Sequence, residues 1–84
     1  MRGRIVCSRA GRDKGEFAVI VGKENSYFLI CDGKQRPLER PKRKNEKHIA
    51  FTNTYLEEDS YKTNKQLRKS LAIYRNQAKF EEET

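Results

Sequence analysis

This 84-residue sequence contains no tryptophan, a single histidine and only two cysteines. Cys7, Cys31 and His48 are too far apart along the chain to match a zinc-ligand spacing, so we expect no metal and no cofactor. The glycine motifs of nucleotide-binding loops are missing, and nothing arranges a catalytic serine or cysteine beside the histidine. These absences predict a protein that is not an enzyme.

Long apolar runs are also missing. No segment approaches the ~20 apolar residues that a membrane-spanning helix needs, so we expect no membrane partner. Only Ile5, Val6 and Cys7 follow the basic start, which is too short for the apolar part of a secretory signal. We therefore expect a cytoplasmic protein. In that reducing compartment Cys7 and Cys31 are expected to be buried thiols, with a disulfide between them as the alternative.

Positive charge is concentrated in the first half of the chain. The net charge is +7, yet residues 1–48 contain 13 Lys and Arg against 6 Asp and Glu, whereas residues 49–84 contain 6 of each kind. Many small proteins are basic for solubility alone. A segregated excess, however, attracts polyanions and speeds their capture, so we favour a polyanionic partner.

Short apolar runs separated by turn residues predict a mainly β domain over residues 1–53. The run 17–21 is apolar throughout, which indicates burial on both faces. Asp32-Gly33 predicts a two-residue hairpin turn, and Pro37 places the strand after it at an edge. Strands this short suggest a small, strongly bent barrel. The expected strands cover residues 5–8, 17–21, 27–31, 34–39 and 48–51.

The character of the chain changes after Asn53. Residues 54–62 are expected to form an acidic linker, residues 63–80 a helix, and residues 81–84 a frayed acidic tail, because glutamates oppose the helix dipole at a C-terminus. Thr63 begins the helix, with Gln66 as its reciprocal capping partner.

One face of the expected helix is apolar. Leu67, Leu71, Tyr74 and Ala78 recur at helical spacing, while lysines and arginines line much of the remainder. We expect this apolar stripe to pack on the barrel. The alternative is a helix that stands off and docks on a protein or on RNA.

The residues 11–15, Gly-Arg-Asp-Lys-Gly, followed by two apolar strands, resemble a KOW motif, an element of SH3-like barrels in ribosomal proteins and transcription elongation factors. Asp32-Gly33-Lys34 with Arg36, and residues 41–48, resemble the small bacterial relatives of KOW-type large-subunit ribosomal proteins. The resemblance covers residues 1–53. It implies an SH3-like barrel that binds RNA, ribosomal RNA in particular. Glu16 departs from the basic residue that many KOW motifs carry there.

The glycine-bounded turn is the first candidate RNA contact. Gly11 and Gly15 are expected to build the turn, and Asp13 to cap it through its own backbone. Arg12 can bridge phosphate oxygens or stack on a base, and Lys14 offers a point charge. The alternative is that the turn only closes a hairpin.

The segment from Arg40 to Lys47 is the second candidate, expected to be a basic loop. Such a run is usually a solvated face, but Pro41 stiffens it and the flanking strands hold it on the barrel. Phe17, Phe28 and Phe51 are assigned to the core, which leaves Tyr55 as the better stacking candidate. The predicted RNA-binding residues are Arg9, Arg12, Lys14, Lys34, Arg36, Arg40, Lys42, Arg43, Lys44, Lys47 and His48.

Together these features predict a monomeric, ribosome-associated RNA-binding module with a C-terminal helix. The alternative is a protein-interaction adaptor that uses the barrel and the helix, with a ribosomal or other protein as its partner.

Overall fold

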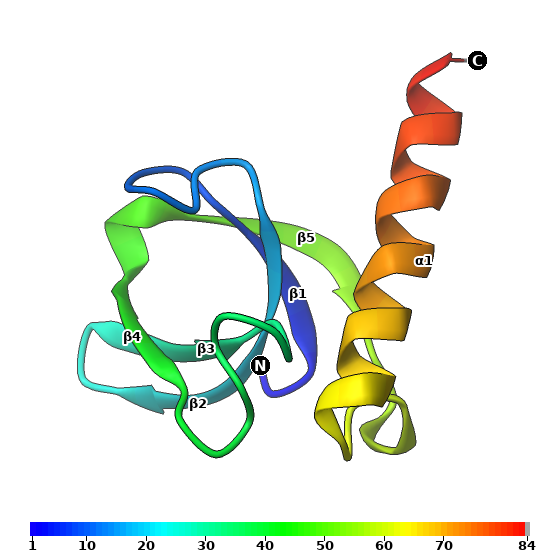
Figure 1. The fold of residues 1–84 in the computed structure, drawn as a ribbon. Coiled ribbons are helices and arrows are strands. Elements are labelled where there is room, and N and C mark those ends of the chain that lie inside the picture. The colour runs from blue at the N-terminus through cyan, green and yellow to red at the C-terminus, as the bar shows by residue number, and fades with distance from the viewer. Residues whose placement is uncertain (84) are drawn as a thin grey trace.

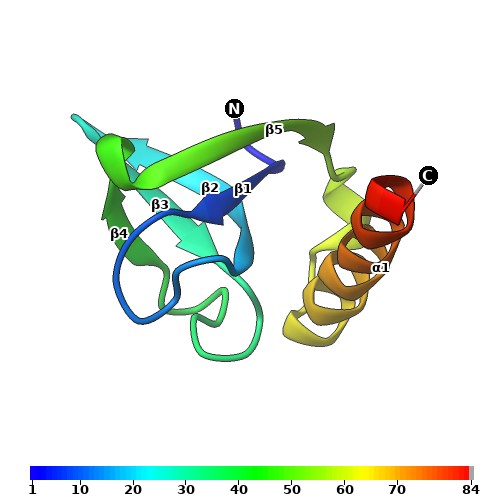
Figure 2. The same ribbon diagram turned by 90° about the horizontal axis from the view of Figure 1, so that it is seen from above.

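The computed structural model describes the backbone of residues 1–83 and the side chains of residues 1–77. Five antiparallel strands form one sheet in the order β4-β3-β2-β1-β5. The sheet curls into an open barrel, with the helix along one side (Figures 1 and 2). The predicted mainly β fold is confirmed, and the arrangement fits an SH3-like barrel. The elements are β1 (Arg4–Ser8), β2 (Phe17–Glu24), β3 (Tyr27–Cys31), β4 (Lys42–Asn45), β5 (Ile49–Tyr55) and α1 (Asn64–Glu83).

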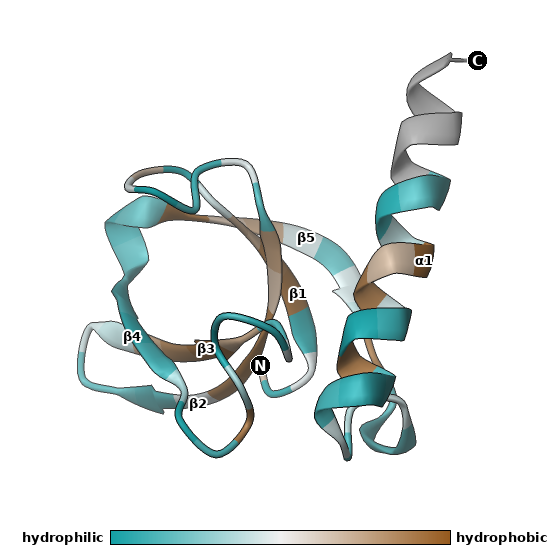
Figure 3. Ribbon diagram, in the orientation of Figure 1, coloured by the Kyte–Doolittle hydropathy of each residue, from teal (hydrophilic) through white to brown (hydrophobic). Residues whose placement is uncertain are grey.

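Strand β2 is buried on both faces, as its apolar run predicts. Ala18 and Ile20 face the barrel interior, where they pack in a cluster with Phe28. Val19 faces the opposite way and packs beneath the helix with Leu67. The alternation of side chains along a strand thus supplies two small cores, one inside the barrel and one between the barrel and α1. Figure 3 shows apolar stretches, in brown, on the strands and on α1.

The helix begins with the predicted capping box. The backbone N–H of Gln66 donates to Thr63 Oγ1 at 3.1 Å, and the backbone N–H of Thr63 donates to Gln66 Oε1 at 3.2 Å. Leu67 and Leu71 are buried against the barrel, so the apolar stripe packs where we expected. The predicted position of Ala78 in the stripe concerns a side chain outside the described ones. The helix runs to Glu83, beyond its expected end at residue 80, and Thr84 lies outside the described backbone.

The fourth strand is not where the sequence placed it. Residues 34–39 form no strand, and Asp32-Gly33 is not a hairpin turn. Instead Asp32 Oδ1 accepts hydrogen bonds from the backbone N–H groups of Lys34 at 2.8 Å and Arg36 at 2.9 Å. These bonds within the loop satisfy the backbone locally and take the place of a strand ladder.

The fourth strand is instead β4, inside the segment expected to be a loop. Lys42 pairs with Ile30 and Lys44 with Phe28 on β3. Tertiary pairing outweighs the low strand propensity of lysine, which is itself common on exposed sheet edges because it discourages further pairing. A short 3₁₀ turn, Glu46–His48, then leads into β5, which runs to Tyr55 and so beyond the expected end at Phe51.

Candidate nucleic-acid interface

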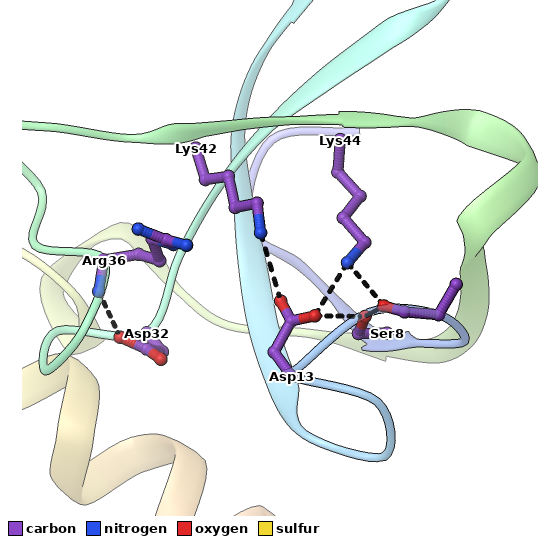
Figure 4. A network of polar contacts seen from close by, with 7 residues as sticks. Ser8, Asp13, Asp32, Arg36, Lys42 and Lys44 are labelled. Atoms are coloured by element: carbon purple, nitrogen blue, oxygen red, sulfur yellow. Dashed lines mark hydrogen bonds and ion pairs between the residues drawn. The ribbon is translucent and has the colours of Figure 1, made fainter.

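The glycine-bounded turn is fixed to the barrel by one carboxylate. Asp13 Oδ1 accepts a hydrogen bond from Ser8 Oγ at 2.9 Å and from Lys44 Nζ at 2.7 Å (Figure 4). Lys44 Nζ also donates to the carbonyl oxygen of Ala10 at 2.9 Å. Asp13 caps the turn through its own backbone, as expected, since its carbonyl oxygen accepts a hydrogen bond from the backbone N–H of Glu16 at 2.9 Å. Its side chain has a further role that the sequence did not predict, because it joins β1 and β4 to the turn.

The surroundings of Asp13 favour its charged form. Partial burial raises the pKa of Asp13, but the hydrogen bonds from Lys44 and Ser8 outweigh burial and hold it below its usual value. Lys42 adds a weaker attraction, since its Nζ lies 4.0 Å from Oδ2. Asp13 thus remains an anion near neutral pH and neutralises Lys44.

The ion pair with Asp13 occupies the ammonium group of Lys44. Its side chain is only 6% exposed, and its ammonium group already has the Asp13 carboxylate and a carbonyl oxygen as partners. Lys44, although predicted to bind RNA, thus stabilises the fold and does not present its charge to a ligand. Its neighbours on β4 are more accessible: Lys42 is half-buried and Arg43 is exposed on the other face.

Three other predicted residues lie together. Arg12 from the turn, Arg36 from the loop after β3 and Lys42 from β4 line a groove of about 390 Å³, which we call the turn groove. Figure 4 shows Lys42 extending from β4 toward Asp13, with Arg36 beside it. The remaining lining residues are Asp13, Glu16 and Gln35. Because Lys44 neutralises Asp13, the cations dominate the turn groove.

A second groove lies between the barrel and α1. It has a volume of about 400 Å³, with Lys34, Arg68 and Arg75 as its cations, and we call it the helix groove. Glu16 and Gln35 line both grooves, so the two adjoin. Asp32 also lines the helix groove, and Phe17 and Leu71 contribute apolar surface.

Arg68 and Arg75 were missing from the predicted site. The sequence places them on the polar side of the helix, and helical spacing alone does not show which part of that side faces the barrel. Packing of Leu67 and Leu71 turns the two arginines toward the loop after β3. There Arg68 Nη1 donates to the carbonyl oxygen of Gly33 at 2.7 Å.

The other predicted residues are dispersed. Arg43 lies over the ring of Tyr27, with its guanidinium carbon 4.7 Å from the ring centre. Arg9 and His48 are neighbours, because the backbone N–H of Arg9 donates to the carbonyl oxygen of His48 at 2.8 Å. The residues Arg9, Lys14, Arg40, Arg43, Lys47 and His48 are exposed and line neither groove.

The cysteines are free thiols rather than a disulfide. Cys31 is buried, as predicted, whereas Cys7 is only half-buried. Burial, followed by the nearby charges of Asp32 and Glu39, raises the pKa of Cys31 to about 11.

Across the described residues, no three His, Cys, Asp or Glu side chains gather as they would around a metal ion. No helix in the same part of the chain has the length and apolar character needed to cross a membrane.

A comparison with models of known protein families finds no match to this chain, and a comparison with curated proteins finds none either.

Proposed function

We propose that this chain is an RNA-binding module that holds the phosphate backbone in the turn groove and the adjoining helix groove. The observation that carries the proposal is the convergence of cations from four separate segments. Arg12, Arg36 and Lys42 meet in the turn groove, and the helix groove beside it adds Lys34, Arg68 and Arg75. Phosphates placed along this path would relieve the repulsion among these side chains.

Two features make the turn groove suited to phosphate. Arginine presents a planar fork of donors that matches phosphate oxygens. The turn that bears Arg12 is also held in place by the bonds from Ser8 and Lys44 to Asp13, so little backbone freedom is lost when RNA binds. The resemblance of residues 1–53 to KOW-type ribosomal proteins supports ribosomal RNA as the partner and the cytoplasm as the site of action.

Salt dependence of RNA binding tests the proposal. Contacts with about five phosphates predict that log affinity falls with log salt at a slope of roughly −3.5 to −4.5. The variant R12Q/R36Q/K42Q removes the cations of the turn groove and is expected to reduce the magnitude of the slope by about 2 to 3. Fluorescence anisotropy with a labelled ribosomal RNA hairpin provides both measurements. Lys44 stays unchanged because its loss would disturb the fold.

The matched control removes the same charge from other surfaces. Lys23, Lys65 and Lys69 are exposed and line neither groove, so K23Q/K65Q/K69Q is expected to keep most of the affinity and the slope. Equal losses in both triple variants would indicate general charge attraction and would rule out the grooves as the site. Co-sedimentation of the chain with ribosomal subunits at low salt, lost at moderate salt, tests the ribosomal partner.

The alternative of a protein adaptor has less support. An adaptor would use the apolar stripe on the helix to bind its partner. Leu67 and Leu71 of this stripe are instead buried against the barrel within this chain. Deleting the helix to find a partner would therefore also expose the core beneath it, at Ile5 and Val19.

A further inference from the structure

The end of the barrel opposite the turn groove carries a row of stacked side chains. The guanidinium carbon of Arg4 lies 5.0 Å from the ring centre of Phe51 and 5.5 Å from that of Tyr55. Arg4 begins β1, whereas Ser8, which holds the turn, ends it. The row, which we call the Arg4–Tyr55 platform, is therefore separated from the turn groove by the length of a strand, about 13 Å.

The position of Tyr55 results from an irregularity in β5. Val6 pairs with Phe51, and Arg4 pairs with Tyr55, so two steps along β1 correspond to four along β5. This bulge places Tyr55 beside Arg4 on the surface. Tyr55 is 54% exposed, whereas Phe51 beneath Arg4 packs against the interior of the barrel.

A hydrogen bond holds the platform in place on its protein side. Arg4 Nε donates to the carbonyl oxygen of Thr52 at 2.7 Å, which fixes the guanidinium group above Phe51. Arg4 in turn supports one side of the Tyr55 ring. A planar ligand that stacks on the exposed part of this ring meets an ordered surface with a cation next to it, so few side-chain rotations are lost on binding.

We infer that the Arg4–Tyr55 platform binds an unpaired RNA base by stacking, as a second contact beyond the two grooves. This inference rests on the proposed function, because it concerns the same ligand. Unpaired bases stack on aromatic rings and guanidinium planes, whereas paired bases in an RNA helix do not present their faces. The grooves hold phosphates of any sequence, and the platform adds a preference for RNA with an unpaired segment.

The test compares single-stranded with double-stranded RNA. The probes are an oligouridine of about ten nucleotides, which stays single-stranded, and a blunt RNA duplex of the same length. Tyr55→Ala is expected to weaken oligouridine binding about 10- to 100-fold while leaving duplex binding within about twofold. Tyr55→Phe keeps the ring and is expected to bind as the wild type does. Ring signals of Tyr55 in NMR spectra are expected to shift when oligouridine is added.

Ile73→Ala is the control, because Ile73 is a similarly exposed apolar side chain, 50% exposed, on the helix. It is expected to leave both affinities unchanged. The inference is overturned if Tyr55→Ala binds oligouridine as tightly as the wild type, or loses both probes equally. In those cases a loss of binding in R12Q/R36Q/K42Q would still support the grooves. If the wild-type chain binds neither probe at low salt, the proposed function fails as well.

Discussion

Lys44 Nζ lies 2.7 Å from Asp13 Oδ1, and this ion pair joins the edge strand β4 to a turn 31 residues earlier in the chain. The Lys44 side chain is almost fully buried, and the Asp13 side chain is partly buried, with 17% of it exposed. A buried ion pair is costly to break from one side, because the remaining charge keeps its desolvation penalty without its partner. The pair therefore makes the position of the turn depend on β4.

Removing one member of the pair is expected to destabilise the protein strongly. Asp13→Asn leaves Lys44 buried without a countercharge, and we expect a loss of about 3 kcal/mol in the free energy of unfolding. The double variant D13N/K44M removes both charges and is expected to be more stable than D13N alone. Urea denaturation followed by circular dichroism measures both. A double variant with additive losses would show that the two side chains do not interact energetically.

The same pair predicts a loss of stability in acid. The pKa of Asp13 is lower in the folded chain than in the unfolded chain, so its stabilising contribution is fully present above about pH 4, the unfolded value. The contribution is lost as the pH falls through the folded pKa. The difference in unfolding free energy between the wild type and Asp13→Asn is therefore expected to shrink below about pH 4. The control is Asp59→Asn, at an 84% exposed side chain, with a small difference at every pH.

Gly33, which lies against the first turn of α1, is expected to tolerate no side chain. Its φ is +81°, and a Cβ there would lie 2.6 Å from the carbonyl oxygen of Asn64 in the first turn of α1. Gly33→Ala combines backbone strain with this clash, so we expect a loss of about 3 kcal/mol.

Gly15 provides the matched control for Gly33. It has a φ of +87°, but a Cβ there would meet no atom within 4 Å. Gly15→Ala is therefore expected to cost about 1 kcal/mol, the strain alone. Urea midpoints of the two variants make the comparison, and equal losses would contradict a close approach of the helix to Gly33.

Cys31 is expected to resist alkylation in the folded protein. With a pKa of about 11, its thiolate is scarce at pH 8, and burial limits access to the sulfur. Iodoacetamide labelling of Cys7→Ser, followed by mass spectrometry, is expected to show slow modification that accelerates in urea. Cys31→Ser reports on the half-buried Cys7 and is expected to label faster. If the two folded variants were alkylated at the same rate, the Cys31 sulfur would be more accessible to iodoacetamide than its burial implies.

The sequence alone determined three features of this protein. These are the strands formed by the apolar runs, the start of the C-terminal helix and the excess of positive charge in residues 1–48. The apolar runs 17–21 and 27–31 and the Thr63–Gln66 capping box are local signals, and local propensity was enough to place β2, β3 and the start of α1. Helical spacing also predicted the burial of Leu67 and Leu71, whereas Tyr74 from the same stripe is only partly buried.

Only the tertiary structure decided how the charged residues are used. The sequence does not distinguish Lys42, Arg43 and Lys44, which are consecutive cations. In β4, Lys44 forms an ion pair with Asp13, Lys42 lines the turn groove and Arg43 lies over the ring of Tyr27. Likewise, Asp32-Gly33 has the composition of a hairpin turn, but the approach of α1 and the hydrogen bonds of Asp32 make it part of a longer loop. These outcomes depend on contacts between segments far apart in the chain, and such contacts leave no periodic trace in a single sequence.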